Sequence, residues 1–367
     1  YVTLKESWIM PDEMITAGLQ EPFGGLAGKL YDFYQSAFSS SSKRLTVQYG
    51  NPSNRNEANE LECRAKEDAR YILPLAFMGQ VGVTINARNL EHLFRRFHLS
   101  PLEEVRKIGE ELYRLVESIA PSLILYAQPS VFENQFGVNV ASLHVQTDDN
   151  PGHDRFNLRF FELPENGDDT VLSLLISTEK QMPLSAATAE VNRLSREQKK
   201  RYFSELFRNM AFFDAPPRHF EFVSIAFEAT ISASCFAQLK RHRMASLLTG
   251  PYSPEYGVSV PDQIRDAGLA VDFIALTDQA DSFYEKYRTA LGDAAGYILT
   301  NAHRRRVLMR FNLRDLYHFI RLRADAHAQW EIRELAQNIE DQIREKMPLT
   351  TLMLSGKDRF TARQESL

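Results

Sequence analysis

The stretch VPDQIRDAGLAVDF, residues 260–273, occurs a second time in the chain as MPDEMITAGLQEPF, residues 10–23. Self-similarity at a fixed spacing is the sequence signature of a repeated structural unit, so this pair decides how the rest of the chain is divided. The identical residues lie 250 positions apart: Pro11/Pro261, Asp12/Asp262, Ala17/Ala267, Gly18/Gly268, Leu19/Leu269 and Phe23/Phe273. The sequence therefore predicts two related copies of one fold.

A second pair of stretches repeats at a different spacing. Residues 69–96 match residues 295–322, with Asn86/Asn312, Arg88/Arg314, Leu90/Leu316 and His92/His318 each 226 positions apart. The drop from 250 to 226 means that the first copy carries about 24 extra residues. We assign them to the polar stretch at about 39–60, whose serine and asparagine content predicts a loop or mobile insertion.

A third pair, residues 104–121 and 331–348, has apolar residues at helical spacing and predicts a helix near the end of each copy. The pattern predicts an internal duplication. The first copy spans 1–125 and is truncated at its front, 126–150 is a linker, and the second copy spans 151–367.

The segment that precedes the repeat in the second copy contains further elements. Residues 153–177 alternate like strands around Asn166-Gly167, which predicts a hairpin. Residues 196–213 have the pattern of an amphipathic helix, and residues 220–243 begin like a strand and continue like a helix. The predicted class is α+β, with helices packed on an antiparallel or mixed sheet in each copy.

Composition sets broad limits on function. With 367 residues, 44% of them apolar, the chain can bury a large core, and its net charge of −5 gives no sign of a nucleic-acid partner. The two cysteines, Cys63 and Cys235, fit a reduced protein better than a disulfide scaffold or a zinc site. No apolar run reaches the roughly 20 residues of a membrane span. We therefore expect a cytoplasmic protein with no membrane partner.

The first candidate site is the triplet Arg241-His242-Arg243. Three neighbouring cationic side chains cannot share one helix face, but a helix end or loop can turn them toward one anion, and guanidinium forks bind phosphate. The alternative interpretation is a solvated basic surface.

The second candidate site lies in residues 311–336, interpreted as one helix. On such a helix Arg314, His318 and Arg321 form one row, and Arg323 and His327 lie one turn apart. Ordinary surface ion pairs are the alternative. Few carboxylates and no cysteines stand at ligand spacing, which argues against a metal site, and no glycine-rich phosphate loop is present.

The two motifs in this order, QLKRHRMAS at 238–246 and NLRDLYHFIRLRADAHAQWEIR at 312–333, resemble the flavin-dependent thymidylate synthases. The resemblance covers nearly all of the second copy from about residue 205 and most of the first. It implies a mixed α/β unit in a homotetramer that binds FAD and dUMP at sites shared between subunits. The implied reaction is reductive methylation of dUMP to dTMP, with methylene-tetrahydrofolate as carbon source and NADPH as reductant of the flavin.

The resemblance also assigns roles to individual positions. Arg323 falls on the column that binds the substrate phosphate, and Arg70 on another nucleotide-binding arginine. Gln238 stands where the family has a glutamine near the nucleotide, and Thr249 replaces a substrate-contacting serine. The positions that the resemblance assigns to the flavin are Arg241, His242, Arg243, Asn312, Arg314, His318 and His327 in the second copy, and Asn86, Arg88 and His92 in the first. No residue is assigned to catalysis.

Several positions depart from the family pattern. The family continues after the triplet as S-x-N-E-x-S-G-R-Y, whereas this chain has a shortened SLLTGPYS at 246–253 in which Pro251 replaces the arginine. Proline offers neither charge nor amide donor. The second copy has Gly296 where the first has Arg70, and the first has Phe97 where the second has Arg323. Tyr1 aligns with the tyrosine that closes the family motif, so we expect the first copy's own triplet to precede this chain.

Each copy thus lacks one nucleotide-binding arginine that the other retains, which leads to the hypothesis of hybrid sites built from both copies. A homodimer of two-copy chains would then reproduce a four-unit assembly. We expect an FAD-dependent thymidylate synthase. The alternative is a catalytically impaired homologue that binds FAD or a nucleotide with a regulatory or structural role, because the substrate loop is degenerate.

Overall fold

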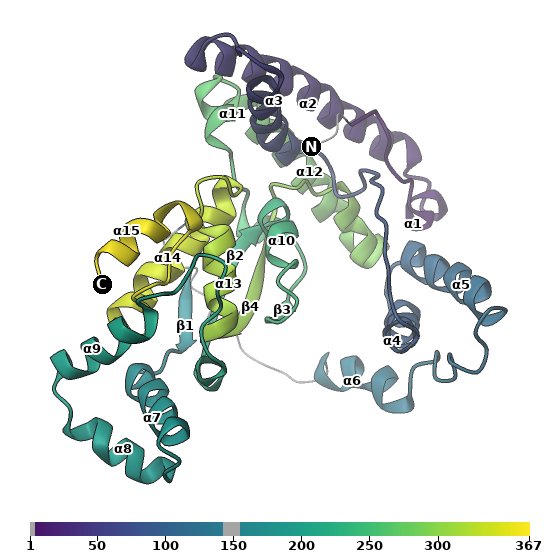
Figure 1. The fold of residues 1–367 in the computed structure, drawn as a ribbon. Helices are drawn as coiled ribbons and strands as arrows, with labels where there is room; N and C mark the ends of the chain where they lie inside the picture. Colours follow the sequence, from purple (N-terminus) through teal and green to yellow (C-terminus); the bar gives the residue numbers. More distant parts are fainter. Residues whose placement is uncertain (1–3, 142–154) are drawn as a thin grey trace. The chain divides into compact units, whose positions relative to one another are not determined.

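The computed structural model describes residues 4–141 and 155–367 (Figure 1). The chain divides into two compact units. Of the described residues, the first unit takes 4–141 together with Val258–His303, and the second takes 155–257 together with Arg304–Leu367. Residues 258–303, which belong to the second sequence copy, are therefore part of the first compact unit. The predicted division into 1–125, 126–150 and 151–367 concerns sequence copies and stays a prediction.

The first unit is helical in its described part, and it contains both members of the first repeated pair, 10–23 and 260–273. From the first copy come α1 (Asp12–Thr16), α2 (Gln20–Tyr49), α3 (Arg55–Ala69), η1 (Arg70–Ile72), α4 (Ala87–His98) and α5 (Glu103–Glu117). The predicted linker contributes α6 (Val131–Ala141). From the second come α11 (Asp262–Asp266), α12 (Ala270–Leu291) and η4 (Gly292–Ile298).

The paired segments 10–23 and 260–273 have the same local structure. α1 and α11 each follow a proline and end before a glycine with positive φ, +68° at Gly18 and +72° at Gly268. A side chain at such a φ is strained, which explains why both copies keep glycine there. Each glycine is followed by a longer helix, α2 or α12.

The two long helices contact each other through a reciprocal pair of phenylalanines. Phe23 packs against Phe283 with ring centroids 6.1 Å apart, and Phe33 packs against Phe273 at 5.9 Å. Phe273 is the counterpart of Phe23, and Phe283 of Phe33, at the spacing of 250. The first pair is therefore the image of the second, as in a contact around a two-fold axis.

Backbone hydrogen bonds around Pro74 and Thr300 show the same reciprocity. These two residues are 226 positions apart and form an antiparallel bridge with each other. The bonds on either side are images of one another: Leu75 N to Leu299 O (2.7 Å) with Asn301 N to Leu73 O (2.9 Å), and Ala76 N to Tyr297 O (2.9 Å) with Ala302 N to Tyr71 O (2.8 Å). The first unit is therefore built around a pseudo-two-fold axis that relates the two sequence copies.

The predicted loop or mobile character of residues 39–60 is wrong, whereas the assignment of the first copy's extra residues to this stretch stays a prediction. The helix α2 continues to Tyr49, and Asn54 then caps α3 by accepting hydrogen bonds from the amides of Asn56 and Glu57, both at 3.0 Å. Burial of Ser41 and Leu45 holds this part of α2 in the unit. Packing thus outweighs the weak helix propensity of the serine run.

The second unit contains an antiparallel sheet in the order β1-β2-β4-β3. The strands are β1 (Arg159–Glu162), β2 (Ser224–Ser232), β3 (Ser246–Thr249) and β4 (Arg304–Asn312). The helices are α7 (Gly167–Glu179), α8 (Leu184–Arg193), α9 (Arg196–Phe207), α10 (Ala233–Leu239), α13 (Leu313–Arg323), α14 (Trp330–Lys346) and α15 (Phe360–Glu365). Short 3-10 turns are η2 (Arg218–Phe222), η3 (Pro254–Tyr256) and η5 (Lys357–Arg359).

Register explains which residues of the sheet form the core. β2 and β4 pair from Ser224 opposite Asn312 to Ser232 opposite Arg304. Because side chains alternate between the faces of a sheet, one face of β4 carries the buried residues Val307, Met309 and Phe311. α13 and α14 pack against this core.

The predicted hairpin around Asn166-Gly167 is wrong in its second arm. β1 forms, but the chain after Asn166 is α7, which begins with Asp168 and Asp169 in its first turn. A Cβ on Gly167 would lie 2.1 Å from the sulfur of Met347, so this glycine permits close packing rather than a hairpin turn. The predicted helix at 196–213 (α9) and the strand-to-helix change at 220–243 (β2, α10) are confirmed.

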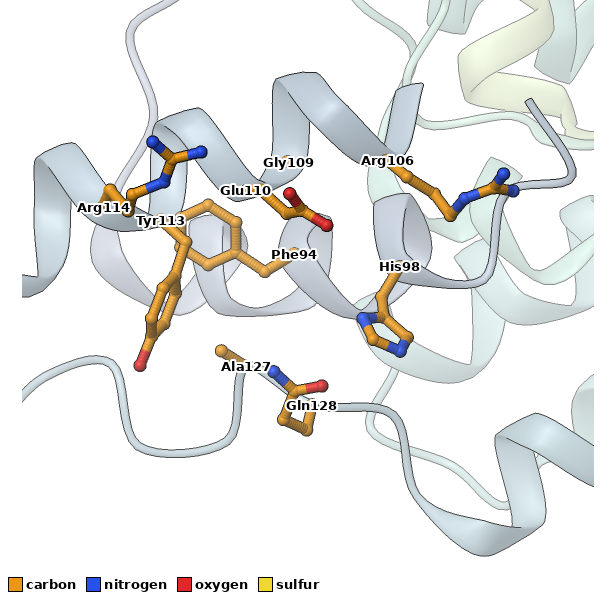
Figure 2. Close-up of a pocket in the computed structure, with 9 residues that line it drawn as sticks. All are labelled: Phe94, His98, Arg106, Gly109, Glu110, Tyr113, Arg114, Ala127 and Gln128. Carbon is orange, nitrogen blue, oxygen red and sulfur yellow. The ribbon is translucent and has the colours of Figure 1, made fainter. Parts of the chain in front are cut away.

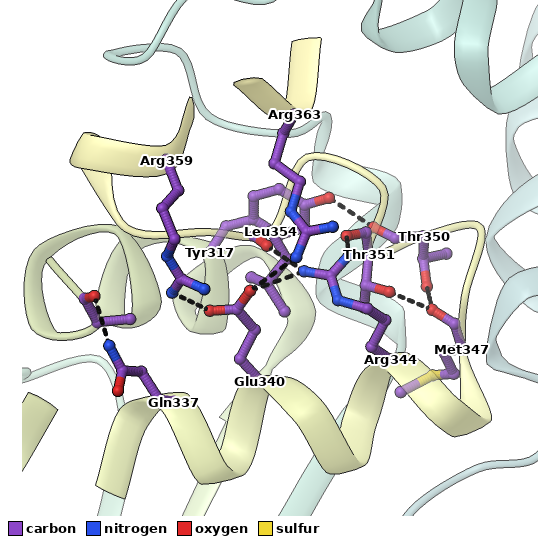
Figure 3. Close-up of polar contacts among 11 residues, drawn as sticks. Tyr317, Gln337, Glu340, Arg344, Met347, Thr350, Thr351, Leu354, Arg359 and Arg363 are labelled. Atoms are coloured by element: carbon purple, nitrogen blue, oxygen red, sulfur yellow. Dashed lines mark hydrogen bonds and ion pairs between the residues drawn. The ribbon is translucent and has the colours of Figure 1, made fainter. Parts of the chain in front are cut away.

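A buried carboxylate holds the C-terminal segment to α14 (Figure 3). Glu340 is fully buried and accepts contacts from three guanidinium groups, at 2.8 Å from Arg344, 2.7 Å from Arg359 and 3.6 Å from Arg363. Arg344 also donates to the carbonyl of Thr351 at 3.0 Å.

The α+β class is confirmed, with one correction. The described part of the first copy contains helices and isolated bridges but none of the named strands, so the expectation of a sheet in each copy is wrong for residues 4–125. Residues 78–86, the counterpart of β4, form no strand. In the second copy β4 pairs with β2 and β3, and no such strands occur among the described residues 4–125.

Candidate functional site

The Arg241-His242-Arg243 triplet lies in the turn that joins α10 to β3. His242 is buried, whereas the two arginines are exposed. The amide of His242 donates to the carbonyl of Leu239 at 3.0 Å, which closes the end of α10. The triplet thus lies at a helix end, as the sequence allowed, and all three residues line one cavity.

The imidazole of His242 is held as a neutral acceptor. Arg323 Nε donates to His242 Nε2 at 2.9 Å, and the rings of Phe319 and His318 lie 5.0 Å and 5.9 Å away. Burial, with smaller contributions from Arg323 and His318, lowers the pKa of His242 to about 4. A neutral ring keeps a lone pair on Nε2 for the guanidinium, which places the ring proton on Nδ1.

Arg323 connects two predicted site residues. Besides His242, its guanidinium contacts the side-chain oxygen of Gln238 through Nη1 and the backbone oxygen of Gln238 through Nη2, both at 3.2 Å. The structure therefore brings Arg323, Gln238 and the triplet together. It shows Arg323 orienting the turn, while its predicted contact with a substrate phosphate stays a prediction.

Asn312, Arg314 and His318 stand at the start of α13, directly after β4. Asn312 caps the helix by accepting a hydrogen bond from the amide of Asp315 at 2.9 Å and donates to the carboxylate of Asp315 at 2.7 Å. Arg314 donates to the carbonyl of Pro216 and to Glu221, both at 2.9 Å. These contacts fix the first turn of α13, from which Arg314 and His318 reach a cavity.

That cavity has a volume of about 430 Å³ and lies wholly within the second unit. Its lining combines cationic side chains, two imidazoles and apolar surface: Ala215, Arg241, His242, Arg243, Met244, Ala245, Phe311, Arg314, Asp315 and His318. Three guanidinium groups against one carboxylate favour an anionic ligand. The sequence interpretation missed Asp315 and Phe311 as lining residues, although both flank predicted positions.

His327 is not brought to this cavity, and the reason is an error in the predicted helix. Residues 311–336 are not one helix, because α13 ends at Arg323 and α14 begins at Trp330. Asp325 accepts from the amide of His327 at 3.0 Å and from its ring at 2.9 Å, which leaves the imidazole exposed. Helical spacing therefore does not relate Arg323 to His327.

The shortened loop after β3 is held by an arginine that the sequence interpretation missed. The guanidinium of Arg305 lies over the rings of Phe236 at 4.9 Å and Tyr252 at 4.3 Å, and its Nε donates to the carbonyl of Gly250 at 2.7 Å. Thr249, at the end of β3, is exposed and does not line the described cavity. The only sequence signal for Arg305 was its place in a run of three arginines at 304–306.

The predicted site residues of the first copy belong to the first unit. Asn86 caps α4 by accepting from the amide of Asn89 at 2.9 Å, the same role that Asn312 has in α13. Arg88 donates to the buried carboxylate of Glu91 at 3.0 Å, and His92 contacts Arg95. Arg70 lies in η1. A flavin contact for these residues stays a prediction.

A second cavity, of about 260 Å³, lies between α4 and α5 (Figure 2). Phe94 lies in its middle, with His98 and Arg106 at one end and Tyr113 and Arg114 at the other. None of its lining residues belongs to the predicted site. Where the structure describes the chain, no group of three or more histidine, cysteine or acidic residues could hold a metal ion, and no helix is long and apolar enough to cross a membrane.

Comparison with known proteins defines the family. The family model described as thymidylate synthase complementing protein matches residues 1–122 and 166–349, which is more than half of the chain. The protein belongs to this family, as the two motifs around 241 and 312–333 indicated. The match falls in two segments, which is consistent with a tandem arrangement.

Individual relatives are more distant. The UPF0159 protein Ta1429 of Thermoplasma acidophilum is 26% identical over 361 residues, which cover 88% of this chain and 70% of the relative. The UPF0159 protein of Chlamydia muridarum is 23% identical, with 77% and 55% covered. The flavin-dependent thymidylate synthase of Sulfolobus acidocaldarius is 31% identical over 125 residues, 32% of this chain and 48% of that enzyme. The chain thus spans about half the length of the last two.

Among solved structures, the UMP/dUMP methylase PolB from Streptomyces cacaoi, bound with 5-Br dUMP, is similar with a TM-score of 0.42 and 18% identity. The similarity covers 57% of this chain and 96% of the methylase chain.

Proposed function

We propose that the protein is an FAD-dependent thymidylate synthase that methylates dUMP to dTMP reductively, with methylene-tetrahydrofolate as carbon donor and NADPH as reductant. Family membership and the flavin-dependent thymidylate synthases among its relatives support an enzyme of the methyltransferase type in nucleotide metabolism. The observation that carries the proposal is the cavity of the second unit, into which Arg241, Arg243 and Arg314 converge beside His242 and His318.

The residues around this cavity fit part of a flavin nucleotide. Guanidinium groups supply donors for phosphate oxygens, and the buried, neutral imidazole of His242 beside Phe311 and His318 supplies surface for a planar ring. Bound FAD would supply the redox chemistry, whereas this chain's residues bind and orient. In the proposal Arg323 and Gln238 hold the turn that carries the triplet, with Arg323 beside the nucleotide phosphate.

A specific observation favours the alternative, a homologue that binds FAD or a nucleotide without turnover. Pro251 stands where the family has an arginine, and Arg305 fixes the carbonyl of Gly250 and the ring of Tyr252. This loop offers no cation of its own at positions 249–252. If the second copy cannot bind substrate alone, the hybrid-site hypothesis requires the first copy to complete the site. In this proposal the protein is a cytoplasmic homodimer of two-copy chains.

Two measurements test the proposal. The purified protein should be yellow and bind about one FAD per chain. In the hybrid-site hypothesis each chain contributes one site that retains its arginines and one that does not. With NADPH and methylene-tetrahydrofolate the protein should release tritium from dUMP labelled at carbon 5. Bound flavin without tritium release establishes the alternative, and a protein that binds no flavin excludes both.

Arg323→Ala tests the assigned role of that residue. We expect the dissociation constant of dUMP to rise by at least about tenfold, as expected for losing a charged hydrogen bond. FAD binding should weaken less. Arg201→Ala, on the exposed side of α9, is the control and should change neither constant. An unchanged dUMP affinity in Arg323→Ala contradicts the assignment.

A further inference from the structure

The cavity between α4 and α5 (Figure 2) has an equivalent place in the second copy, where the chain itself fills it. α13 lies 226 positions after α4, and α14 lies 227 positions after α5. Beyond α14 the chain turns back over both helices. Tyr317 on α13 donates to the carbonyl of Thr350 at 2.6 Å, and Arg344 on α14 donates to the carbonyl of Leu354 at 2.6 Å. Most of the segment 347–356 is therefore buried in the groove between α13 and α14.

The first copy makes the same turn after α5. Glu91 is the counterpart of Tyr317, and it accepts a hydrogen bond from the amide of Leu125 at 2.9 Å. Ala127, the counterpart of Leu354, is buried in a small core cluster that includes side chains of α4 and α5. The two copies thus fold back over the same pair of helices, and the differences between them lie in the side chains.

A glycine lets the chain close the groove in the second copy. A Cβ on Gly356 would lie 2.7 Å from the carbonyl oxygen of Ala324, which directly follows α13, so only glycine permits this approach. The counterparts of Gly356 and Ala324 in the first copy are Pro129 and His98. A proline ring cannot make the same contact, and His98 lines the cavity instead.

Side chains that fill the groove of the second copy have smaller or outward-facing counterparts in the first. Leu354 is fully buried, whereas its counterpart Ala127 is three carbon atoms smaller. Arg359 reaches inward to the buried carboxylate of Glu340 at 2.7 Å, whereas its counterpart Phe132 is exposed. The cavity of the first copy therefore follows from particular replacements in the sequence.

The remaining lining is aromatic in the middle and cationic at the ends. The rings of Phe94 and Tyr113 pack edge to face with centroids 5.4 Å apart. His98 and Arg106 stand at one end of the cavity and Arg114 at the other (Figure 2). Aromatic side chains favour a planar ring between them, and guanidinium groups favour an anion.

The charge of the lining also differs between the copies. Arg114 stands where the second copy has Asp341, and His98 stands where it has the apolar Ala324. Glu110 is the one carboxylate in the lining, against two guanidinium groups and an imidazole. The exchanges thus favour an anionic ligand in the first copy only.

Arg106 is held in place at its end of the cavity. Its Nη1 donates to the carbonyl of Ser100 at 2.5 Å, and its Nη2 contacts the carboxylate of Glu103. A guanidinium fork that is already oriented loses little conformational entropy when it binds a carboxylate or a phosphate.

We propose that this cavity binds a small molecule that consists of one aromatic ring and one anionic group, a carboxylate or a phosphate ester. The ring lies against Phe94 and Tyr113, and the anionic group lies at the end that His98 and Arg106 form. The volume of about 260 Å³ is below the roughly 300–1,000 Å³ of sites for larger ligands, so a single ring fits. The cavity lies wholly in the first unit and shares no residue with the cavity at Arg241, so the inference does not rest on the proposed function.

Titration of the full chain with small probes, followed by ligand-observed NMR, tests the inference. 4-Hydroxyphenylacetate or phenyl phosphate should bind with a dissociation constant of about 1 mM or lower, in the range of such small ligands. The tighter of the two identifies the anionic group. Benzyl alcohol, which has no charge, and inorganic phosphate, which has no ring, should each bind at least about tenfold more weakly.

Substitutions at position 127 place the probe in the cavity. Ala127→Leu gives the first copy the leucine of the second, and by filling the cavity it should weaken binding of the tighter probe at least about tenfold. Ala127→Ser is the matched control of nearly unchanged size, and its affinity should stay within about twofold. Arg241→Ala, in the lining of the other cavity, should also leave the affinity unchanged.

Arg106→Gln tests the anionic half of the ligand without filling the cavity, since the glutamine amide can still donate to the carbonyl of Ser100. Both anionic probes should bind about tenfold more weakly to this variant, as expected for losing a charged hydrogen bond. If Ala127→Leu lowers the melting temperature, Arg106→Gln decides the inference.

Three outcomes overturn the inference. The first is that neither anionic probe binds saturably. The second is unchanged affinity in Arg106→Gln, or in an Ala127→Leu variant that melts like the unmodified protein. The third is that Arg241→Ala removes the binding, which would place the probe in the cavity of the second unit.

Discussion

At the scale of single residues, His242 links the stability of the second unit to its candidate site. The imidazole is buried and accepts a hydrogen bond from Arg323, so its neutral form is part of the folded structure. A protonated ring would place a second cation against the guanidinium and remove the acceptor. The residue that sequence alone assigned to a cationic triplet is therefore neutral at physiological pH.

This state of His242 predicts a dependence of stability on pH. Its pKa in the folded protein is about 4, below the ordinary value of 6.5, so the unfolded chain takes up the proton first as the pH falls. The contribution to stability is complete above pH 6.5 and is lost between pH 6.5 and 4, with an amplitude on the order of 2 kcal/mol after a discount for solvent screening. Urea unfolding at pH 7.5, 6 and 5 measures it.

His242→Gln provides the control, because its amide oxygen can still accept from Arg323 but does not titrate. The free energy of unfolding of the second unit should fall less between pH 7.5 and 5 in this variant than in the unmodified protein. Equal losses in the two proteins would show that other groups carry the pH dependence.

At the scale of elements, the sequence predicts those whose pattern is local. Phe203 and Phe207 lie one turn apart and give α9 its buried face, which periodicity alone detects. α13 and α14 were merged because the break depends on side-chain caps, with Asp325 and Gln329 binding backbone amides. Such caps are individual hydrogen bonds, and the spacing of apolar residues along the sequence does not reveal them.

The candidate site was predictable to a similar extent. The family resemblance assigned Arg241, His242, Arg314 and His318 to one site, and the structure places all four beside one cavity, where the ring of His242 contacts that of His318. Arg305 could not be foreseen, since its role comes from two aromatic rings and a loop carbonyl that meet only in three dimensions.

The attachment of the C-terminal segment gives a prediction for a whole element. Glu340→Gln removes the buried charge that Arg344, Arg359 and Arg363 share (Figure 3). Breaking such a network should cost about 3 kcal/mol or more, since three cations lose their partner. Urea unfolding should show this loss, and hydrogen exchange should show early opening of α15. Glu345→Gln, exposed on the same helix, should change neither; equal effects of both substitutions would contradict the role of Glu340.

At the scale of the whole molecule, the pseudo-two-fold axis of the first unit makes equivalent positions energetically comparable. Phe23 and Phe273 are equivalent residues of the two copies, and both are fully buried. Phe23 contacts Phe283, and Phe273 contacts Phe33, the residue equivalent to Phe283.

Truncating the ring of Phe23 or Phe273 to alanine should lower the free energy of unfolding of the first unit by about 3–5 kcal/mol, as large aromatic-to-alanine changes in cores do. The two losses should agree within about 1 kcal/mol, because each deletion opens the image of the same contact. Chemical unfolding of Phe23→Ala and Phe273→Ala compares them, with Phe132→Ala, 73% exposed, as a control that changes stability little. If one deletion is costly and the other nearly neutral, the two contacts are not equivalent, and the reciprocal geometry does not reflect a shared packing unit.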